Sequence, residues 1–193
     1  MPGSLGVTAP AIYNYFPRLD DLITALVIDA FSHFADAIVA AIEASANEAS
    51  ASQLRAGALA YRQWAIDHAV DFELIYGNPI PGYEAPAEIT VPLAARPLLV
   101  MGGLLLAAHR SGELRIPDAY TTLPPAVEAY LAEHYAEMME GAPITLVTLL
   151  ASSWSHMHGM VMLELFGHLG PVVGDSGAFY AQEIDVLLAS FGL

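Results

Sequence analysis

Cysteine and lysine are both missing from the 193-residue sequence. The lack of cysteine excludes disulfides, thiolate nucleophiles and cysteine-bound metals. The lack of lysine leaves six arginines against 21 acidic side chains, for a formal net charge of −15. Because attraction to phosphate dominates nucleic-acid affinity, the chain as a whole is a poor match for DNA. Any DNA contact must come from a small local surface.

Patterns typical of strands and of targeting segments are scarce as well. Alternating β-branched runs are absent, whereas Ala, Leu, Met and Glu recur at helical spacing, which predicts an all-α protein. Met1 is followed by Pro2 and Gly3, and the basic segment and apolar segment of a secretory signal are both missing. We therefore expect no secretory signal and a cytoplasmic protein. Hydrophobic residues make up 55% of the chain, enough apolar surface for a large core and for a partner subunit.

Residues 141–163 contain no Asp, Glu, Lys or Arg and are long enough to cross a bilayer. Serine and histidine side chains interrupt this segment, and no basic flank follows it. We therefore expect no contact with a membrane. We interpret the segment as a buried helix that contacts both its own core and a second subunit.

Helical periodicity, caps and breakers divide the chain into elements, and the helices predicted at 18–46, 50–68 and 176–191 carry one-sided stripes that include Phe34, Tyr61 and Tyr180 respectively. Pro92 and Pro97 are expected to bend one of the helices or delay its start. The prolines and glycines between helices predict loops over residues 78–86 and 112–125. The helices are predicted at residues 8–16, 18–46, 50–68, 88–110, 125–140, 143–168 and 176–191, with a short helical turn at 72–76.

A glycine turn and a capped helix stand near the N-terminus, in the segment LGVTAPAIYNYFP (residues 5–17). Thr8 can cap a helix that opens with small residues, which would let a recognition helix enter the major groove closely. Polar groups farther along the helix suit contacts with phosphate. With Asp20, Asp21 and Leu22, the segment resembles the turn and recognition helix of the TetR (tetracycline-repressor-like) family of bacterial transcription regulators.

The resemblance implies that the start of this helix faces bases and that its aromatic end approaches phosphates. Arg18 would supply a further phosphate contact, because Leu19 stands where the family usually has a lysine. The base-facing residues would be Thr8, Ala9, Pro10 and Ala11, the phosphate-facing ones Tyr13, Asn14 and Tyr15, and the core ones Ile12 and Phe16. The alternative is an ordinary capped helix of an all-α protein.

The family's first helix and most of its second have no counterpart in the sequence. One explanation is that the recorded start is too late and the protein carries an upstream basic segment, and this is the one we favour. The other is a headless dimer-forming protein that cannot hold an operator. Either way, we expect a partial helix-turn-helix head and connecting helix in residues 1–46, a ligand-binding and dimerisation domain in residues 47–193, and weak or absent operator binding by this chain.

Aromatic and polar side chains share helix faces in two later segments. Trp154 and His158 are four residues apart, and Tyr61, Trp64 and His68 form a similar face. A pocket lined by aromatic rings, methionines and a few polar tips suits a small apolar or aromatic effector. The candidate lining residues are Tyr61, Trp64, His68, Phe72, Tyr76, Met101, Trp154, His158 and Met162.

The alternative for each of these residues is simple packing in the core. The residues Trp154, His158 and Gly159 nevertheless resemble the signature of a TetR subgroup whose C-terminal sensing domain is named for Trp, His and Gly. The resemblance extends over almost the whole chain, from Leu5 to Phe191. It implies a TetR-like fold and a ligand-sensing body.

The same resemblance implies a homodimer whose interface is a four-helix bundle made by residues 143–168 and 176–191 of both subunits. The residues support this independently, because Gly159 and Gly167 would allow close helix approach. The segment 143–168 also has more apolar surface than one core can cover. A monomer with a fully buried central helix is the alternative.

Several apparent catalytic signals have simpler explanations. The sequence Gly174-Asp175-Ser176-Gly177 copies a serine-protease motif, but a helix N-cap at Asp175 or Ser176 fits a helical chain better. His156 and His158 point to different faces of a helix and could not share a metal ion. We therefore predict no catalytic residue, no metal and no cofactor. The function predicted is a ligand-responsive TetR-type regulator, most simply a repressor. The alternative is a headless ligand-binding dimer, or a helical small-molecule carrier or enzyme without DNA binding.

Overall fold

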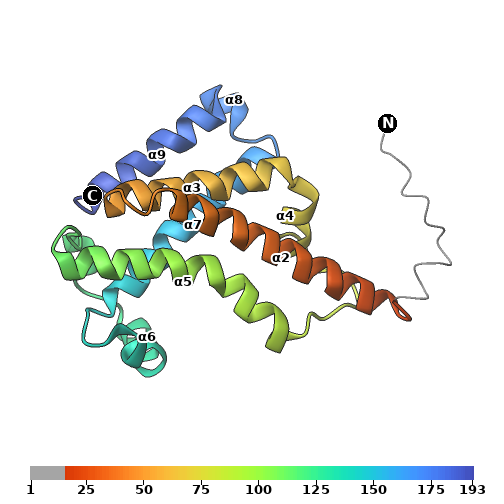
Figure 1. Ribbon diagram of the computed structural model, residues 1–193, viewed down its shortest axis with the longest axis horizontal. Helices are drawn as coiled ribbons and strands as arrows, with labels where there is room; N and C mark the ends of the chain where they lie inside the picture. The colour runs from red at the N-terminus through yellow and green to blue at the C-terminus, as the bar shows by residue number, and fades with distance from the viewer. Residues whose placement is uncertain (1–15) are drawn as a thin grey trace.

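The computed structural model describes residues 16–193, and every regular element in that range is a helix. The predicted all-α class is therefore confirmed. The elements are α2 (Leu19–Ala44), α3 (Ser50–Asp67), α4 (Ala69–Tyr76), α5 (Ala87–Ser111), the 3-10 helix η1 (Asp118–Tyr120), α6 (Pro125–Met139), α7 (Thr145–Leu165), α8 (Gly170–Val173) and α9 (Ser176–Ser190). Figure 1 shows them in chain order. The predicted recognition helix, with its base- and phosphate-facing residues from Thr8 to Tyr15, lies outside the described residues.

The predicted boundaries differ from the structure mainly at chain reversals. The helical turn predicted at 72–76 is a two-turn helix that begins at Ala69, directly after α3. The long helix predicted at 143–168 ends at Leu165, because Gly167 adopts the left-handed conformation (φ 72°) that closes the turn after it. This backbone requirement accounts for Gly167 within the subunit, and its role in close helix approach to a second subunit stays a prediction. Helices η1 and α8 were not predicted, since each spans a single turn.

Helix α2 lies along α3, α4 and α5 (Figure 1). Its first turn carries Asp20 and Asp21, which favour the positive end of the helix, and Asp21 accepts a hydrogen bond from the backbone N–H of Arg18 (3.1 Å). Its side chains Phe34 and Ile38 are fully buried. Helix α2 is therefore part of the same core as the rest of the body.

Helix α5 starts at Ala87 despite Pro92 and Pro97, so the expectation of a late start was wrong. Figure 1 shows α5 changing direction along its length. A proline cannot donate the backbone hydrogen bond of its turn and its ring crowds the preceding turn, which accounts for the bend.

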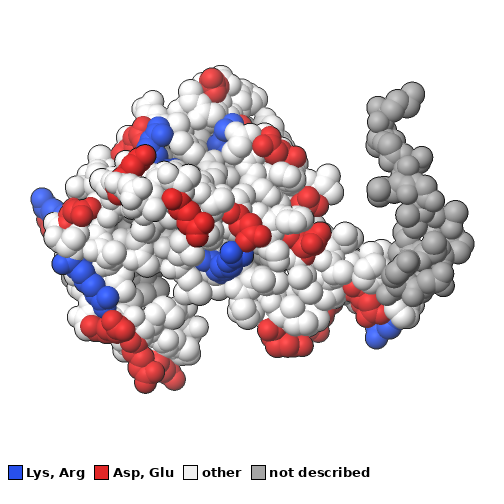
Figure 2. Space-filling view, in the orientation of Figure 1, with Lys and Arg blue, Asp and Glu red and all other residues white. Residues whose placement is uncertain are grey.

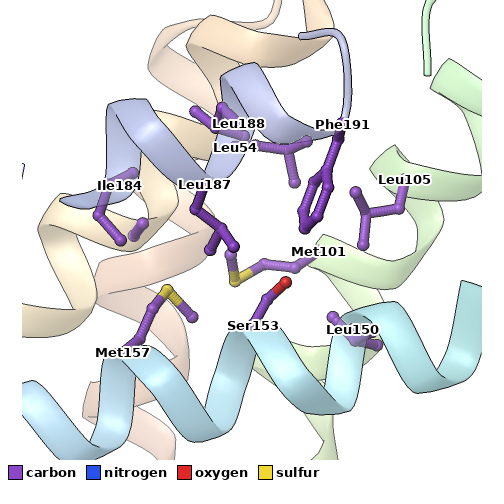
Figure 3. A pocket seen from close by; sticks show the side chains of 11 residues that line it. Leu54, Met101, Leu105, Leu150, Ser153, Met157, Ile184, Leu187, Leu188 and Phe191 are labelled. Atoms are coloured by element: carbon purple, nitrogen blue, oxygen red, sulfur yellow. The ribbon is translucent and has the colours of Figure 1, made fainter. Parts of the chain in front are cut away.

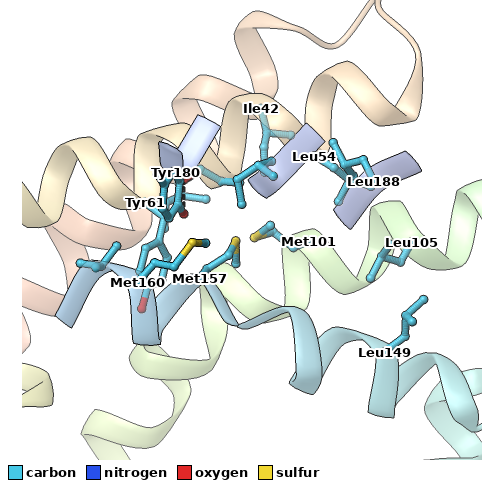
Figure 4. Packing of buried hydrophobic residues seen from close by; sticks show 14 of the residues in the cluster. Ile42, Leu54, Tyr61, Met101, Leu105, Leu149, Met157, Met160, Tyr180 and Leu188 are labelled. Carbon is cyan, nitrogen blue, oxygen red and sulfur yellow. Dashed lines mark hydrogen bonds between the residues drawn. The ribbon is translucent and has the colours of Figure 1, made fainter. Parts of the chain in front are cut away.

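Helices α3, α5, α7 and α9 direct apolar side chains into one core (Figure 4). Tyr180 of α9 is fully buried, and its hydroxyl donates a hydrogen bond to the carbonyl of Ala58 in α3 (2.9 Å). Asp175 caps α9 by accepting a hydrogen bond from the N–H of Ala178 (2.9 Å), as the sequence predicts. The hydrogen bond of Tyr180 therefore joins α9 to α3.

By length and composition, α2 and α5 could each cross a bilayer. This is weak evidence, because core helices of soluble proteins pass the same test.

Candidate ligand-binding site and dimer surface

An aromatic cluster occupies the place where α2, α3, α4 and α7 meet. Phe34 of α2 lies at its centre, with ring centroids 4.9 Å from Tyr61, 5.1 Å from Trp64, 5.9 Å from Tyr76 and 6.0 Å from Phe72. Most of these rings meet edge to face, the arrangement that aromatic quadrupoles favour. Phe31 extends the cluster along α2 by an edge contact with Tyr76 (5.8 Å). The cluster therefore joins helix α4 to helix α2.

His158 of α7 is the polar group of this cluster. Its Nδ1 atom is 2.8 Å from the hydroxyl of Tyr61, and its ring lies 5.0 Å from Tyr76, 5.6 Å from Phe72 and 5.7 Å from Trp154. Burial lowers the pKa of His158 from its ordinary value of 6.5, so the ring is neutral at neutral pH. Burial raises the pKa of Tyr61, which keeps its phenol protonated and able to donate a hydrogen bond to Nδ1. Burial also raises the pKa of Tyr76 to about 12.

A hollow of about 300 Å³ opens beside the cluster, between α4 and the last turn of α7. Its volume is at the lower end of the range for small-molecule sites. Phe72 belongs both to the cluster and to the wall of the hollow. The lining residues are Ala69, Phe72, Glu73, Met162, Leu165 and Phe166.

A second cavity lies between α3, α5, α7 and α9, but it measures only about 30 Å³ (Figure 3). Met101, Met157 and Leu187 point into it, together with Ser153, whose hydroxyl donates a hydrogen bond to the carbonyl of Leu149 (2.8 Å). A space of this size holds one or two water molecules at most, and its apolar lining disfavours even those. It is a packing gap and not a site for an effector.

The structure brings together most, but not all, of the predicted lining residues. Six of them form the aromatic cluster, and Met162 joins Phe72 at the hollow. Met101 lines the small cavity instead. His68 is exposed and stacks on Trp64 at 4.8 Å, on the outer side of the cluster. The six residues of the cluster are Tyr61, Trp64, Phe72, Tyr76, Trp154 and His158.

Sequence reasoning missed Phe34 as a site residue, although its place on the apolar stripe of α2 was predicted. It also missed Glu73, Leu165 and Phe166 of the hollow. The stripe identifies Phe34 as buried, but no local pattern shows that α3 and α4 pack against α2 at this point. The hollow exists only because α4 folds back against the end of α7.

The predicted dimer helices α7 and α9 carry large apolar side chains that the subunit leaves exposed. Leu163 is 47% exposed and Val186 is 55% exposed. His156 and Glu183 lie 3.5 Å apart at the exposed edges where the two helices adjoin. A Cβ atom added at Gly159 would meet nothing within 4 Å, so this part of α7 is open to the approach of another helix.

Comparisons with known proteins agree with this architecture. A family model described as the tetracyclin-repressor-like C-terminal domain matches residues 54–187. The helical body is thus that of a bacterial transcription regulator, and the chain belongs to the TetR family.

Among its relatives are the HTH-type transcriptional regulators Rv1816 of Mycobacterium tuberculosis and Mb1846 of Mycobacterium bovis. Each is 28% identical over 188 residues, which cover 96% of this chain and 79% of the relative. The crystal structure of SCO4313, described as a regulatory protein, superposes with a TM-score of 0.71 at 32% identity, over 95% of this chain and 80% of that one. A protein of unknown function from Rhodococcus sp. RHA1 shares the fold, with a TM-score of 0.69 at 17% identity, over 97% of this chain and 80% of that one.

Proposed function

We propose that this chain is the sensing and dimerising body of a ligand-responsive, cytoplasmic TetR-type repressor. The observation that supports this most directly is that one residue of the hollow's wall also packs against helix α2. That residue is Phe72, whose ring lies 6.0 Å from the ring of Phe34 in α2. A small apolar or aromatic effector in the hollow is therefore one side chain away from the helix that leads to the N-terminal segment.

The mechanism follows from these contacts. An effector that displaces α4 from α7 also displaces the ring of Tyr76, which touches both Phe31 and Phe34 of α2. A change in the direction of α2 alters the separation of two heads in a dimer, and with it the affinity for the operator. Such coupling requires that the effector bind one head separation more tightly than the other.

The charge distribution supports our proposal that DNA binding is left to the N-terminal segment. Figure 2 shows acidic side chains spread over the visible face of the body, most of the basic ones lying beside an acidic one. Arg18 is an exposed arginine at the start of α2, and its guanidinium is 2.7 Å from Asp20. A phosphate contact by Arg18 would compete with this ion pair. A basic segment upstream of residue 1, as proposed from the sequence, would supply the remaining affinity.

The ligand-sensing part is tested with the 193-residue chain in a thermal-shift screen of small apolar and aromatic compounds. Compounds that raise the melting temperature should also slow amide hydrogen exchange in α4 and α2, and should be recovered unchanged after incubation. Stabilising compounds that leave exchange in α2 unchanged would contradict the coupling. Chemical conversion of a compound would instead support the rival proposal of an enzyme.

The DNA-binding part is tested by a gel-shift assay with the DNA upstream of the coding frame. The 193-residue chain should bind weakly and without sequence preference, whereas a version extended into the upstream frame should bind specifically. Nanomolar operator binding by the 193-residue chain would overturn the proposal that specific DNA binding needs an additional upstream segment.

A further inference from the structure

The arginines of the body are almost all committed to carboxylates. Among residues 16–193, five of the six arginines make ion pairs: Arg18 with Asp20, Arg55 with Asp185, Arg62 with Glu164, Arg96 with Asp36 and Arg110 with Glu140. The remaining one, Arg115, lies beside Gly192, and its backbone N–H donates to the carbonyl of Phe191. The sequence has no lysine to add. No arginine lines the hollow between α4 and α7.

A ligand that carries a carboxylate or phosphate would therefore find no cationic partner in the wall of the hollow. Burying an unpaired anion against an apolar wall is unfavourable, and burying it next to another anion more so. Anionic effectors are the class that this wall disfavours most strongly.

The carboxylate of Glu73 gives the hollow a negative charge, which favours a cationic ligand. This carboxylate is the one charged group among the lining residues, and it makes no ion pair with any described arginine or histidine. Glu73 is exposed at the rim of the hollow, and its side-chain stem lies close over Gly77, where an added Cβ would come within 2.8 Å of Cγ. Asp71 and Asp67 are exposed nearby on α4 and at the end of α3, which makes this end of the molecule negative.

The rest of the wall is apolar and contains two aromatic rings. Phe72 is fully buried beneath the hollow, whereas Phe166 is 52% exposed at its edge. Met162 and Leu165 complete the apolar side. Aromatic faces attract organic cations, and Phe166 is the ring of this wall that a ligand can reach directly, with Phe72 forming the buried floor beneath it.

We propose that the hollow between α4 and α7 binds an organic cation with an apolar body, its charged group against Glu73 and its apolar part against Phe72, Met162 and Phe166. This inference rests on the proposed sensing function and adds the chemical class of the effector. The volume of about 300 Å³ suits a ligand with one or two rings.

The test uses two probes of the same shape that differ by one positive charge, phenyltrimethylammonium and tert-butylbenzene. Each is titrated into the 193-residue chain and followed by calorimetry and by the fluorescence of the two tryptophans. The cation should bind about tenfold more tightly than the neutral probe. Glu73→Gln should remove that difference and leave the affinity for tert-butylbenzene unchanged, whereas Asp71→Asn, on the same helix but outside the lining, should preserve it.

Phe166→Ala locates the binding. Because Phe166 is half exposed, the variant should fold normally and bind both probes more weakly. Unchanged affinity of both probes in this variant would place them elsewhere and overturn the assignment of the hollow.

The remaining outcomes separate this inference from the function on which it rests. Equal binding of the two probes by the native chain, or an equal loss in Asp71→Asn and Glu73→Gln, would overturn the cation preference and leave an apolar sensing site in place. Failure of both probes to bind would remove the hollow as a ligand site and overturn both proposals.

Discussion

At the scale of single residues, the polar groups of the core are few and most have a specific partner; among the described residues, the buried hydroxyl of Thr148 has none. Tyr61 and His158 share one hydrogen bond within the aromatic cluster, and Tyr180 donates to the backbone of α3. A buried polar group without a partner costs about 1–3 kcal/mol, so these pairs fix which rings face one another. The arrangement of the core therefore depends on which groups these side chains hydrogen-bond as well as on how deeply they are buried.

The lowered pKa of His158 predicts a specific dependence of stability on pH. Its pKa in the folded chain is below 6.5 because burial disfavours the charged ring, whereas the unfolded chain titrates at its ordinary value. As the pH falls below 6.5 the unfolded state gains the proton first, so the free energy of unfolding decreases until the folded pKa is reached. The melting temperature of the native chain should fall more steeply with decreasing pH than that of His158→Gln. Parallel curves would contradict this role of His158.

The ion pair between Arg62 and Glu164 predicts a large cost when one partner is removed. The guanidinium holds both carboxylate oxygens, its side chain is 19% exposed and that of Glu164 is 16% exposed. Glu164→Leu leaves Arg62 largely buried and unpaired, and should lower the free energy of unfolding by about 3 kcal/mol. The double variant Arg62→Met, Glu164→Leu should recover most of the lost free energy of unfolding, as measured by urea unfolding.

The matched control for this pair is Arg55 and Asp185, which also join α3 to a later helix but are 41% and 53% exposed. Asp185→Leu should leave the midpoint of urea unfolding nearly unchanged, because solvent screens an exposed pair. A similar cost for both pairs would mean that burial does not set the energy of the Arg62–Glu164 contact.

At the scale of elements, the helices differ in how firmly the core holds them. Helix α3 buries residues along its whole length, including Leu54, Tyr61 and Ala65, whereas α6 buries only Leu131 and Met139. Apolar side chains of α6 remain exposed, among them Tyr130 at 57%. Local stability follows the number of buried contacts.

Amide hydrogen exchange should therefore be faster in the middle of α6 than in the middle of α3. The expected difference is at least about a hundredfold in protection, since α6 can open without disturbing the main core. Mass spectrometry on peptides that cover the two helices provides the measurement. Equal protection would show that a surface outside the described contacts covers α6.

At the scale of the whole molecule, the exposed apolar side chains of α7 and α9 predict how subunits pair. Leu163 lies two turns along α7 from His156, and Val186 lies one turn along α9 from Glu183, so both follow the line where the helices adjoin. A self-complementary surface around this line suits a two-fold dimer.

Val186→Glu should weaken this dimer by at least about a hundredfold, because the two-fold axis brings like charges together in a desolvated interface. Sedimentation velocity at micromolar concentrations measures the loss. Val91→Glu on α5 is the control: Val91 is 61% exposed and lies outside α7 and α9, so the dimer should persist. Dissociation by both variants, or by neither, would argue against the α7–α9 interface.

The sequence alone determined the helical class, most helix positions and the buried stripes, because these depend on local spacing, caps and breakers. Phe34, Tyr61 and Tyr180 were all predicted on apolar stripes and are all buried. Its shortage of positive charge also fixed the acidic character of the body. The tertiary structure decided the rest: the packing of α3 and α4 around Phe34, the separation of Met101 from the cluster, the position of His68 at the cluster's exposed edge, and the hollow with Glu73 in its wall. These depend on helix crossings between residues far apart in the chain, and a crossing is set by the fit of whole surfaces, which no local pattern records.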